Sequence, residues 1–172
     1  MRTPTLVSEE EYLHSDYEPD CDFVDGELLE RNVGERPHSI LQREFIIYFA
    51  NRRKQWRLHV FPEQRIRVAP RRYRVPDVAI YREPAPREPV FSTPPFIAIE
   101  ILSPEDRMSR IRPKIDDYLT FGVSYVWVIY PEARKADVYT PGHFFEASGL
   151  ILRTENPVIE VPLAELFAAL DE

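Results

Sequence analysis

Glu100 is the residue whose surroundings point most strongly to chemistry. It lies in the segment 96–102 (Phe-Ile-Ala-Ile-Glu-Ile-Leu), in which all the remaining residues are apolar. A continuous apolar run of this kind is typical of a strand covered on both faces. Burying an unpaired carboxylate is strongly unfavourable, so the site must supply a cation, a proton or a cleft. Alternatively, the strand ends in water here, since Ser103 is expected to begin a helix. We favour a functional role because perturbed acids concentrate at functional sites.

Asp77 is a second acid within an apolar strand pattern, residues 75–80 (Val-Pro-Asp-Val-Ala-Ile). Pro76 lacks a backbone donor, which places this stretch at a sheet edge, an irregularity or a strand start. On its own, Asp77 is more typical of a turn or a cap. Together with Glu100 it suits a hard-cation site, since magnesium takes one or two carboxylates and otherwise keeps water or substrate phosphate. With four His and one Cys in the chain, Mg²⁺ or Mn²⁺ fits better than zinc.

Lys114 is the third candidate. It follows Pro113 on the next expected helix, and Ile111, Ile115 and Tyr118 recur around it at helical spacing, so it lies at the margin of the buried stripe. A lysine there could polarise a water or stabilise charge on a phosphorane. A lysine that only extends its head group into water explains the pattern equally well.

Positive charge gathers just before Asp77, although the net charge of the chain is −7. Residues 52–74 carry nine bases against Glu63 alone, and both ends of the chain are acidic. Such a run can follow a phosphate backbone, although a solvated face is the more usual explanation. The predicted nucleic-acid-binding residues are Arg57, Arg65, Arg67, Arg71, Arg72 and Arg74.

Length and composition define the broad class. The 172 residues suit one domain spanning 1–172, and hydrophobic and charged contents are ordinary, which disfavours disorder and coiled coil. No apolar run approaches the roughly 20 residues of a membrane helix, and the N-terminus lacks a signal pattern. One cysteine excludes an internal disulfide framework, and no glycine-rich phosphate loop occurs, so no nucleotide cofactor is expected. We expect a cytoplasmic protein that associates with no membrane.

The hydrophobic pattern predicts a mixed α/β or α+β fold around one sheet. The expected elements are a helix from Ser8 to His14, a hairpin at 23–29 with an Asp25-Gly26 turn, a helix at 37–56, an antiparallel hairpin with arms 59–68 and 73–81, a stiff connector at 82–95, a strand at 96–102, a helix start at Ser103-Pro104, a break at Pro113 followed by a helix to Thr120, a stop at Gly122, strands at 124–130, 136–139 and 144–146, and a helix at 163–170.

The order of these motifs resembles known nucleases. Pro76-Asp77 followed by Glu100 after an apolar strand looks like the PD-(D/E)xK pattern of restriction-endonuclease-like proteins. A closer resemblance, over about residues 8–140, is to the Uma family, a group of endonuclease-like proteins long catalogued as a domain of unknown function. The segments that carry it are 23–28 (Phe-Val-Asp-Gly-Glu-Leu), 73–79 (Tyr-Arg-Val-Pro-Asp-Val-Ala), 99–104 (Ile-Glu-Ile-Leu-Ser-Pro), Lys114 with Tyr118, and 122–127 (Gly-Val-Ser-Tyr-Val-Trp).

The resemblance implies a restriction-endonuclease-like core: a mixed central sheet flanked by helices, with an N-terminal hairpin and a C-terminal meander. It also implies a divalent ion held by Asp77, Glu100 and the carbonyl of Ile101, and hydrolysis of DNA phosphodiester bonds. The superfamily pattern places a lysine two residues after the glutamate, where this chain has Leu102. In the Uma family the following helix supplies that lysine, so Lys114 takes the role by position.

Several alternatives stay open at this point. Glu27 and His38 match recurrent family positions and could complete the site, but each is equally explained as a structural residue. The second hypothesis is that the chain is a catalytically inactive nuclease-fold module that binds nucleic acid or a protein partner. The third hypothesis is a plain structural or interaction domain. A homodimer is expected only by analogy with enzymes that cut both strands.

Overall fold

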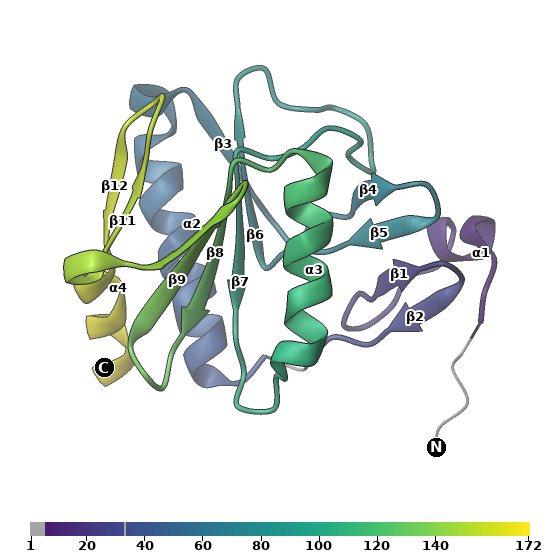
Figure 1. Cartoon of the computed structure of the whole chain (residues 1–172), viewed down its shortest axis with the longest axis horizontal. Coiled ribbons are helices and arrows are strands. Elements are labelled where there is room, and N and C mark those ends of the chain that lie inside the picture. Colours follow the sequence, from purple (N-terminus) through teal and green to yellow (C-terminus); the bar gives the residue numbers. More distant parts are fainter. Residues whose placement is uncertain (1–5, 33) are drawn as a thin grey trace.

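The computed structural model describes residues 6–32 and 34–172 of the chain, and Figure 1 labels their helices and strands. The helices are α1 (Glu9–Leu13), α2 (Arg36–Trp56), α3 (Met108–Phe121) and α4 (Leu163–Ala168), with short 3-10 turns at Ser148–Leu150 and Ala169–Asp171. The strands are β1 (Asp22–Val24), β2 (Glu27–Leu29), β3 (Leu58–Pro62), β4 (Ile66–Ala69), β5 (Arg72–Arg74), β6 (Val78–Arg82), β7 (Ile97–Ile101), β8 (Tyr125–Tyr130), β9 (Lys135–Thr140), β10 (His143–Glu146), β11 (Ile151–Thr154) and β12 (Ile159–Pro162). The predicted mixed α/β fold is confirmed.

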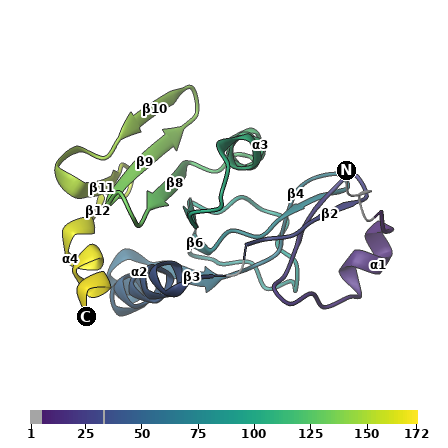
Figure 2. The same ribbon diagram turned by 90° about the horizontal axis from the view of Figure 1, so that it is seen from below.

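A six-stranded sheet in the order β10-β9-β8-β7-β6-β3 forms the centre of the fold. Neighbouring strands are antiparallel except β7 and β8, which are parallel and connected through α3. A parallel pair needs such a crossover because its strands run in the same direction. The view in Figure 2 places α2 and α3 on opposite faces of this sheet. The sheet is therefore covered on both sides, as the continuous apolar pattern of β7 predicts.

Alternation along β7 assigns its side chains to the two helices. Ile97 and Ile99 belong to the core cluster that includes Phe45 of α2, whereas Ala98 belongs to the cluster that includes Ile115 of α3. The five side chains just named, from β7, α2 and α3, are completely buried. Since successive strand residues point to opposite faces, the next residue in the series after Ala98 also faces α3, and that residue is Glu100.

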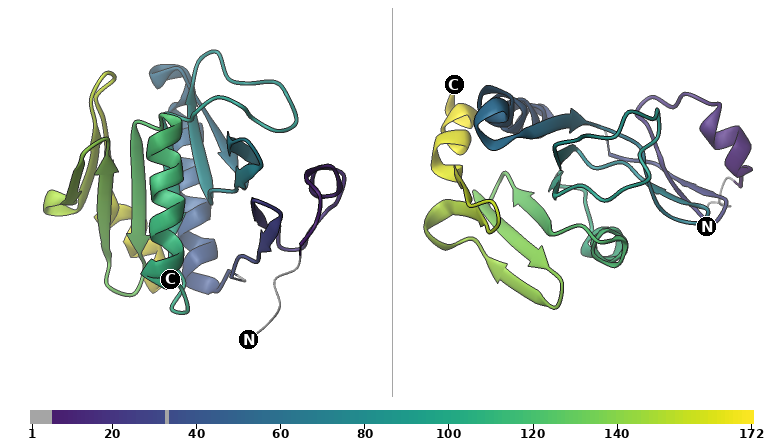
Figure 3. Two further views of the ribbon diagram at one scale, coloured as in Figure 1. Left: turned by 45° about the vertical axis from the view of Figure 1, so that its right-hand side comes forward. Right: turned by 90° about the horizontal axis from the view of Figure 1, so that it is seen from above.

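A smaller sheet with the order β2-β1-β5-β4 lies beside the central one. The hairpin predicted over residues 59–81 is antiparallel as expected, but its arms divide between the two sheets: β3 pairs with β6 in the central sheet, while β4 pairs with β5 in the small sheet. The predicted turn at Asp25-Gly26 is confirmed, and both residues have positive φ. In Figure 3 the small sheet and α1 lie at the end of the molecule opposite α4.

The C-terminal part of the chain completes the core on the α2 face. The hairpin β11–β12 contributes Leu152 and Val161 to the same cluster as Leu163 of α4 and Leu41 of α2. No strand was predicted for residues 151–162, whereas the helix predicted from Leu163 is confirmed and ends in a 3-10 turn.

Two predictions about α3 are wrong. Ser103 does not begin a helix: its N–H donates to Asp106 Oδ2 at 2.7 Å, so the segment turns back on itself and α3 begins at Met108. Pro113 does not interrupt the helix, which runs unbroken to the predicted stop at Gly122, because packing of its buried face offsets the lost backbone bond. In the described residues, none of the helices combines the length and the apolar character needed to span a bilayer.

Candidate active site

Strand register brings the two candidate acids together. Strands β6 and β7 pair antiparallel with Val78 opposite Ile99, so one further step places Asp77 opposite Glu100. Asp77 also contacts the residue that follows Glu100, since the N–H of Ile101 donates to Asp77 Oδ2 at 2.7 Å. Both acids are 4% exposed, which means that their charges must be compensated by the protein itself.

The carboxylate of Asp77 is held by two basic side chains as well as by Ile101. The Nη2 atom of Arg31 donates to Oδ1 at 2.5 Å, and Nε2 of His38 lies 3.2 Å from the same oxygen. Burial on its own would raise the pKa of Asp77, but the hydrogen bond to His38 and the charge of Arg31 hold this pKa well below its usual range. Asp77 is therefore a buried anion whose every oxygen has a partner.

The carboxylate of Glu100 is held by two residues of α3. Lys114 Nζ donates to Oε2 at 2.9 Å, and the hydroxyl of Tyr118 donates to Oε1 at 2.7 Å. Lys114 and Tyr118 are four residues apart, so they occupy the same helix face. Burial raises the pKa of Glu100 to about 7, Lys114 opposes this rise, and Asp77 adds to it. Lys114 thus reaches the glutamate from the helix, in a geometry that suits the role expected of it.

A buried ion-pair network fixes these groups from the small sheet. Asp22 of β1 accepts from the N–H of Val75 at 2.8 Å and from Arg74 Nη1 at 3.1 Å, and it lies 3.7 Å from Lys114 Nζ. Arg74 also pairs with Asp117 of α3. Sequence reasoning did not select Asp22 as a site residue. Its only signal is an acid at the buried first position of an otherwise apolar strand.

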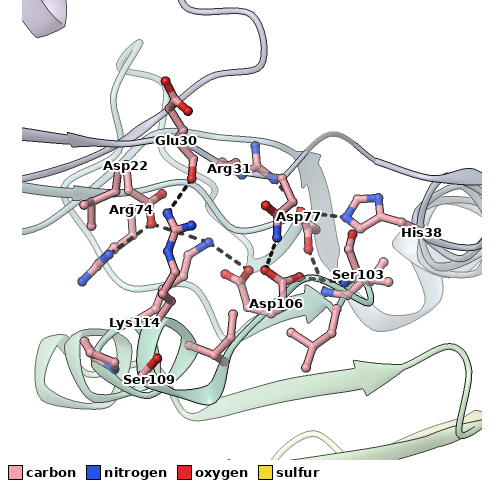
Figure 4. A pocket seen from close by; sticks show the side chains of 18 residues that line it. Asp22, Glu30, Arg31, His38, Arg74, Asp77, Ser103, Asp106, Ser109 and Lys114 are labelled. Atoms are coloured by element: carbon pink, nitrogen blue, oxygen red, sulfur yellow. Dashed lines mark hydrogen bonds and ion pairs between the residues drawn. The ribbon is translucent and has the colours of Figure 1, made fainter. Parts of the chain in front are cut away.

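These side chains surround one cavity of about 220 Å³, shown in Figure 4. In that view Arg31 and His38 approach Asp77 from the segment after β2 and from α2, while Lys114 rises from α3 on the other side. Asp77, Glu100, Ile101 and Lys114 all line the cavity. Further polar lining residues that were not predicted as site residues include Asp22, Arg31, Asn32, Asp106, Ser109 and Arg110.

Of the two residues that could complete the site according to the sequence, only His38 lies at the cavity. His38 lines the cavity and contacts Asp77, whereas Glu27 lies on an exposed position of β2. The desolvation of His38 lowers its pKa, but the hydrogen bond and charge of Asp77 outweigh this effect, and the pKa is raised.

The six arginines predicted to bind nucleic acid do not form one surface. Arg57, Arg67 and Arg71 are exposed, although Arg57 pairs with Glu83 at 3.1 Å and Arg67 lies 3.8 Å from Glu9. The other three are engaged within the fold: Arg65 makes a two-pronged contact with Asp20, Arg72 pairs with Asp25 and Asp117, and Arg74 is buried against Asp22 and Asp117. Contacts with nucleic acid stay a prediction for all six.

The donor groups around the cavity fit a hard divalent ion. The carboxylates of Asp77 and Glu100 both line the cavity, which matches the preference of magnesium for one or two carboxylates with water completing its shell. Among residues 6–32 and 34–172, no group of three or more His, Cys, Asp or Glu side chains is arranged to hold a metal. An ion bound here would therefore keep several waters or substrate oxygens.

Comparison with known proteins identifies the family. Residues 9–167 match the Uma2 family, described as "Putative restriction endonuclease", and the chain belongs to that family, which confirms the predicted resemblance. A crystal structure titled a "putative nuclease belonging to DUF820", from Anabaena variabilis ATCC 29413, superposes with a TM-score of 0.80 over 95% of this chain and 99% of that chain, at 22% sequence identity. At this identity the likeness establishes the fold. Among curated proteins, none is similar enough to count as a match.

Proposed function

We propose that this chain is a divalent-metal-dependent endonuclease that hydrolyses phosphodiester bonds in DNA. The observation that carries the proposal is the convergence of Asp77, Glu100 and Lys114 on one cavity, from the loop before β6, from β7 and from α3. Membership of a family described as "Putative restriction endonuclease" supports the same reaction.

The residues divide into ligands and a charge-bearing group. Asp77, Glu100 and the carbonyl of Ile101 would hold Mg²⁺ or Mn²⁺, which when bound lowers the pKa of a water and neutralises phosphate charge. The ammonium of Lys114 has three donors, of which one goes to Glu100 and one to the carbonyl of Val75 at 3.1 Å. The third is left to orient a water or to stabilise charge developing on the phosphate.

Contacts to the DNA backbone are assigned to the exposed arginines Arg57, Arg67 and Arg71. Such contacts position a duplex without reading its sequence. Arg65, Arg72 and Arg74 are less exposed and pair with acids of the fold around the site, so their replacement would act first on stability.

A plasmid-nicking assay with Mg²⁺ or Mn²⁺ tests the function. Wild type should nick the plasmid, and Asp77→Asn should lower the rate by about 10²-fold or more. Asp137→Asn is a matched control, because Asp137 is also buried but lies in β9 and does not line the cavity. Equal cleavage by the Asp77→Asn variant, or no cleavage by wild type with either ion, would contradict the proposal.

A second candidate function is a catalytically inactive module that binds nucleic acid. One observation favours it: both candidate metal ligands already pair with cations of the protein, Asp77 with Arg31 and Glu100 with Lys114. This alternative predicts salt-sensitive DNA binding that survives the double change Asp77→Asn and Glu100→Gln and needs no metal. A gel-shift titration at several salt concentrations distinguishes the two functions.

A further inference from the structure

Arg31 occupies a position at which its charge conflicts with a metal ion. Its Nη2 atom lies 2.5 Å from Asp77 Oδ1, and its side chain is only 11% exposed. Asp77 Oδ1 already has Arg31 Nη2 and His38 Nε2 beside it, and a divalent ion added there would meet the full charge of the guanidinium at close range in a buried site, where the repulsion is strong. If Asp77 is a metal ligand, Arg31 must therefore give up this contact when the ion binds.

The other terminal nitrogen of Arg31 has no such partner. Its Nη1 atom is buried and makes no hydrogen bond within the described residues. Glu63 Oε1 lies 3.7 Å from Nη1, beyond hydrogen-bond distance, and the Glu63 side chain is about half exposed. A buried donor without an acceptor is unfavourable, so this nitrogen is available to an anion that enters the cavity.

We propose that Arg31 is a movable cation of the site: it compensates Asp77 in the metal-free protein, and it binds a backbone phosphate of the substrate once a divalent ion has taken its place. This inference rests on the proposed nuclease function and adds a residue to it. The planar guanidinium suits the second role because its fork of donors matches two phosphate oxygens at once.

Neighbouring acids give Arg31 a short path between the two roles. Glu63 can receive the guanidinium as it leaves Asp77, and His38 and the N–H of Ile101 continue to hold the Asp77 carboxylate. Asp77 consequently stays oriented during the exchange, which a single-partner ion pair would not allow.

Metal binding measured without any reaction gives the first test. Mn²⁺ affinity is determined by paramagnetic resonance of the free ion, for wild type and for Arg31→Gln. Removing the competing charge should tighten Mn²⁺ binding by about tenfold, equivalent to ~1.4 kcal/mol. Arg110→Gln is the control, because Arg110 lines the same cavity but donates to the carbonyl of Glu30 rather than to either acid. Its effect should stay within about twofold.

DNA binding gives the second test and should move in the opposite direction. The affinity for fluorescein-labelled duplex DNA is measured by anisotropy in Ca²⁺. Arg31→Gln should weaken it by about tenfold, the loss of one charge-assisted phosphate contact. A residue that only held the fold would weaken metal and DNA binding together, and a residue that only blocked the metal would leave DNA binding unchanged. Either result, or equal tightening of Mn²⁺ by Arg110→Gln, overturns the proposal.

Arg31→Lys keeps the test decisive if Arg31→Gln fails to fold. The lysine retains a charge for Asp77 but lacks the two-pronged fork. It should bind Mn²⁺ within about threefold of wild type and still bind DNA several-fold more weakly. Parallel loss of both affinities would contradict the proposal. Failure of the nuclease function is distinguishable, since wild type would then bind Mn²⁺ and DNA without cleaving, while the opposite shifts of Arg31→Gln would persist.

Discussion

Lys114 and Glu100 form a buried ion pair in which Nζ and Oε2 are 2.9 Å apart, and it joins α3 to β7. The lysine is 6% exposed and the glutamate 4%, so each charge depends on the other for compensation. In such a pair the loss of one partner is more harmful than the pair itself is stabilising. The catalytic candidates therefore also contribute to the stability of the fold, and the effect of substituting them must be measured on both stability and activity.

Lys114→Met should destabilise the fold in a pH-dependent manner. At pH 8 it leaves the carboxylate of Glu100 buried with only Tyr118 as a donor, which should lower the free energy of unfolding by about 3–5 kcal/mol. At pH 5 Glu100 can remain protonated, so the loss should be much smaller. Urea unfolding at both pH values measures the difference. Lys54→Met, at an exposed position of α2, should change little at either pH, and an equal loss at both would contradict the interpretation.

Glu100→Gln should remove a pH dependence of stability in the metal-free protein. Burial raises the pKa of Glu100 from 4.5 to about 7, so between these values the folded state binds more protons than the unfolded state. Stability contributed by this group is then present at acid pH and is lost as the pH rises toward 7. Wild type should lose stability over this window relative to Glu100→Gln. Urea titrations at pH 4.5, 6 and 7.5 test this, and parallel curves for the two proteins would refute it.

Asp22→Asn should destabilise the protein more than a matched change on the surface. Asp22 accepts hydrogen bonds from the Val75 N–H and from Arg74, and the amide would leave the buried arginine with one charged partner fewer. We expect a loss of about 2–4 kcal/mol. Asp25→Asn removes an exposed pair with Arg72 and should be worth no more than ~1 kcal/mol. Thermal unfolding of both variants measures the contrast, and losses of similar size would argue against the proposed network.

The sequence allowed the central part of the site to be predicted because its signals are local. An acid in the middle of an apolar strand stands out, and this singled out Glu100 and Asp77, which do face one cavity. Lys114 was placed at the margin of a helical stripe, and it is buried there against Glu100. The functional roles of these three residues stay predictions until they are tested by activity.

Other features could not be predicted because they depend on contacts between distant segments. Arg31 and Asp77 are 46 residues apart in the sequence, and Asp22 and Val75 are 53 apart. No local sequence pattern indicates either contact. The helix start predicted at Ser103 agreed with the capping preferences. In the structure, however, the side chain of Asp106 accepts hydrogen bonds from the N–H of Ser103 and from the side chain of Asn32. Short hairpins such as β11–β12 likewise depend on the surface against which they pack.

The division of one long hairpin between two sheets has a mechanical consequence. The chain leaves the small sheet at Arg74 and enters the central sheet at Val78, and Asp77 lies in the few residues of this crossing. The cavity has one wall on each sheet, with Asp22 and Arg74 on one side and Glu100 on the other. The position of the small sheet relative to the central sheet therefore sets the width of the cavity, and the ion pairs of Arg72 and Arg74 with Asp117 of α3 hold that position.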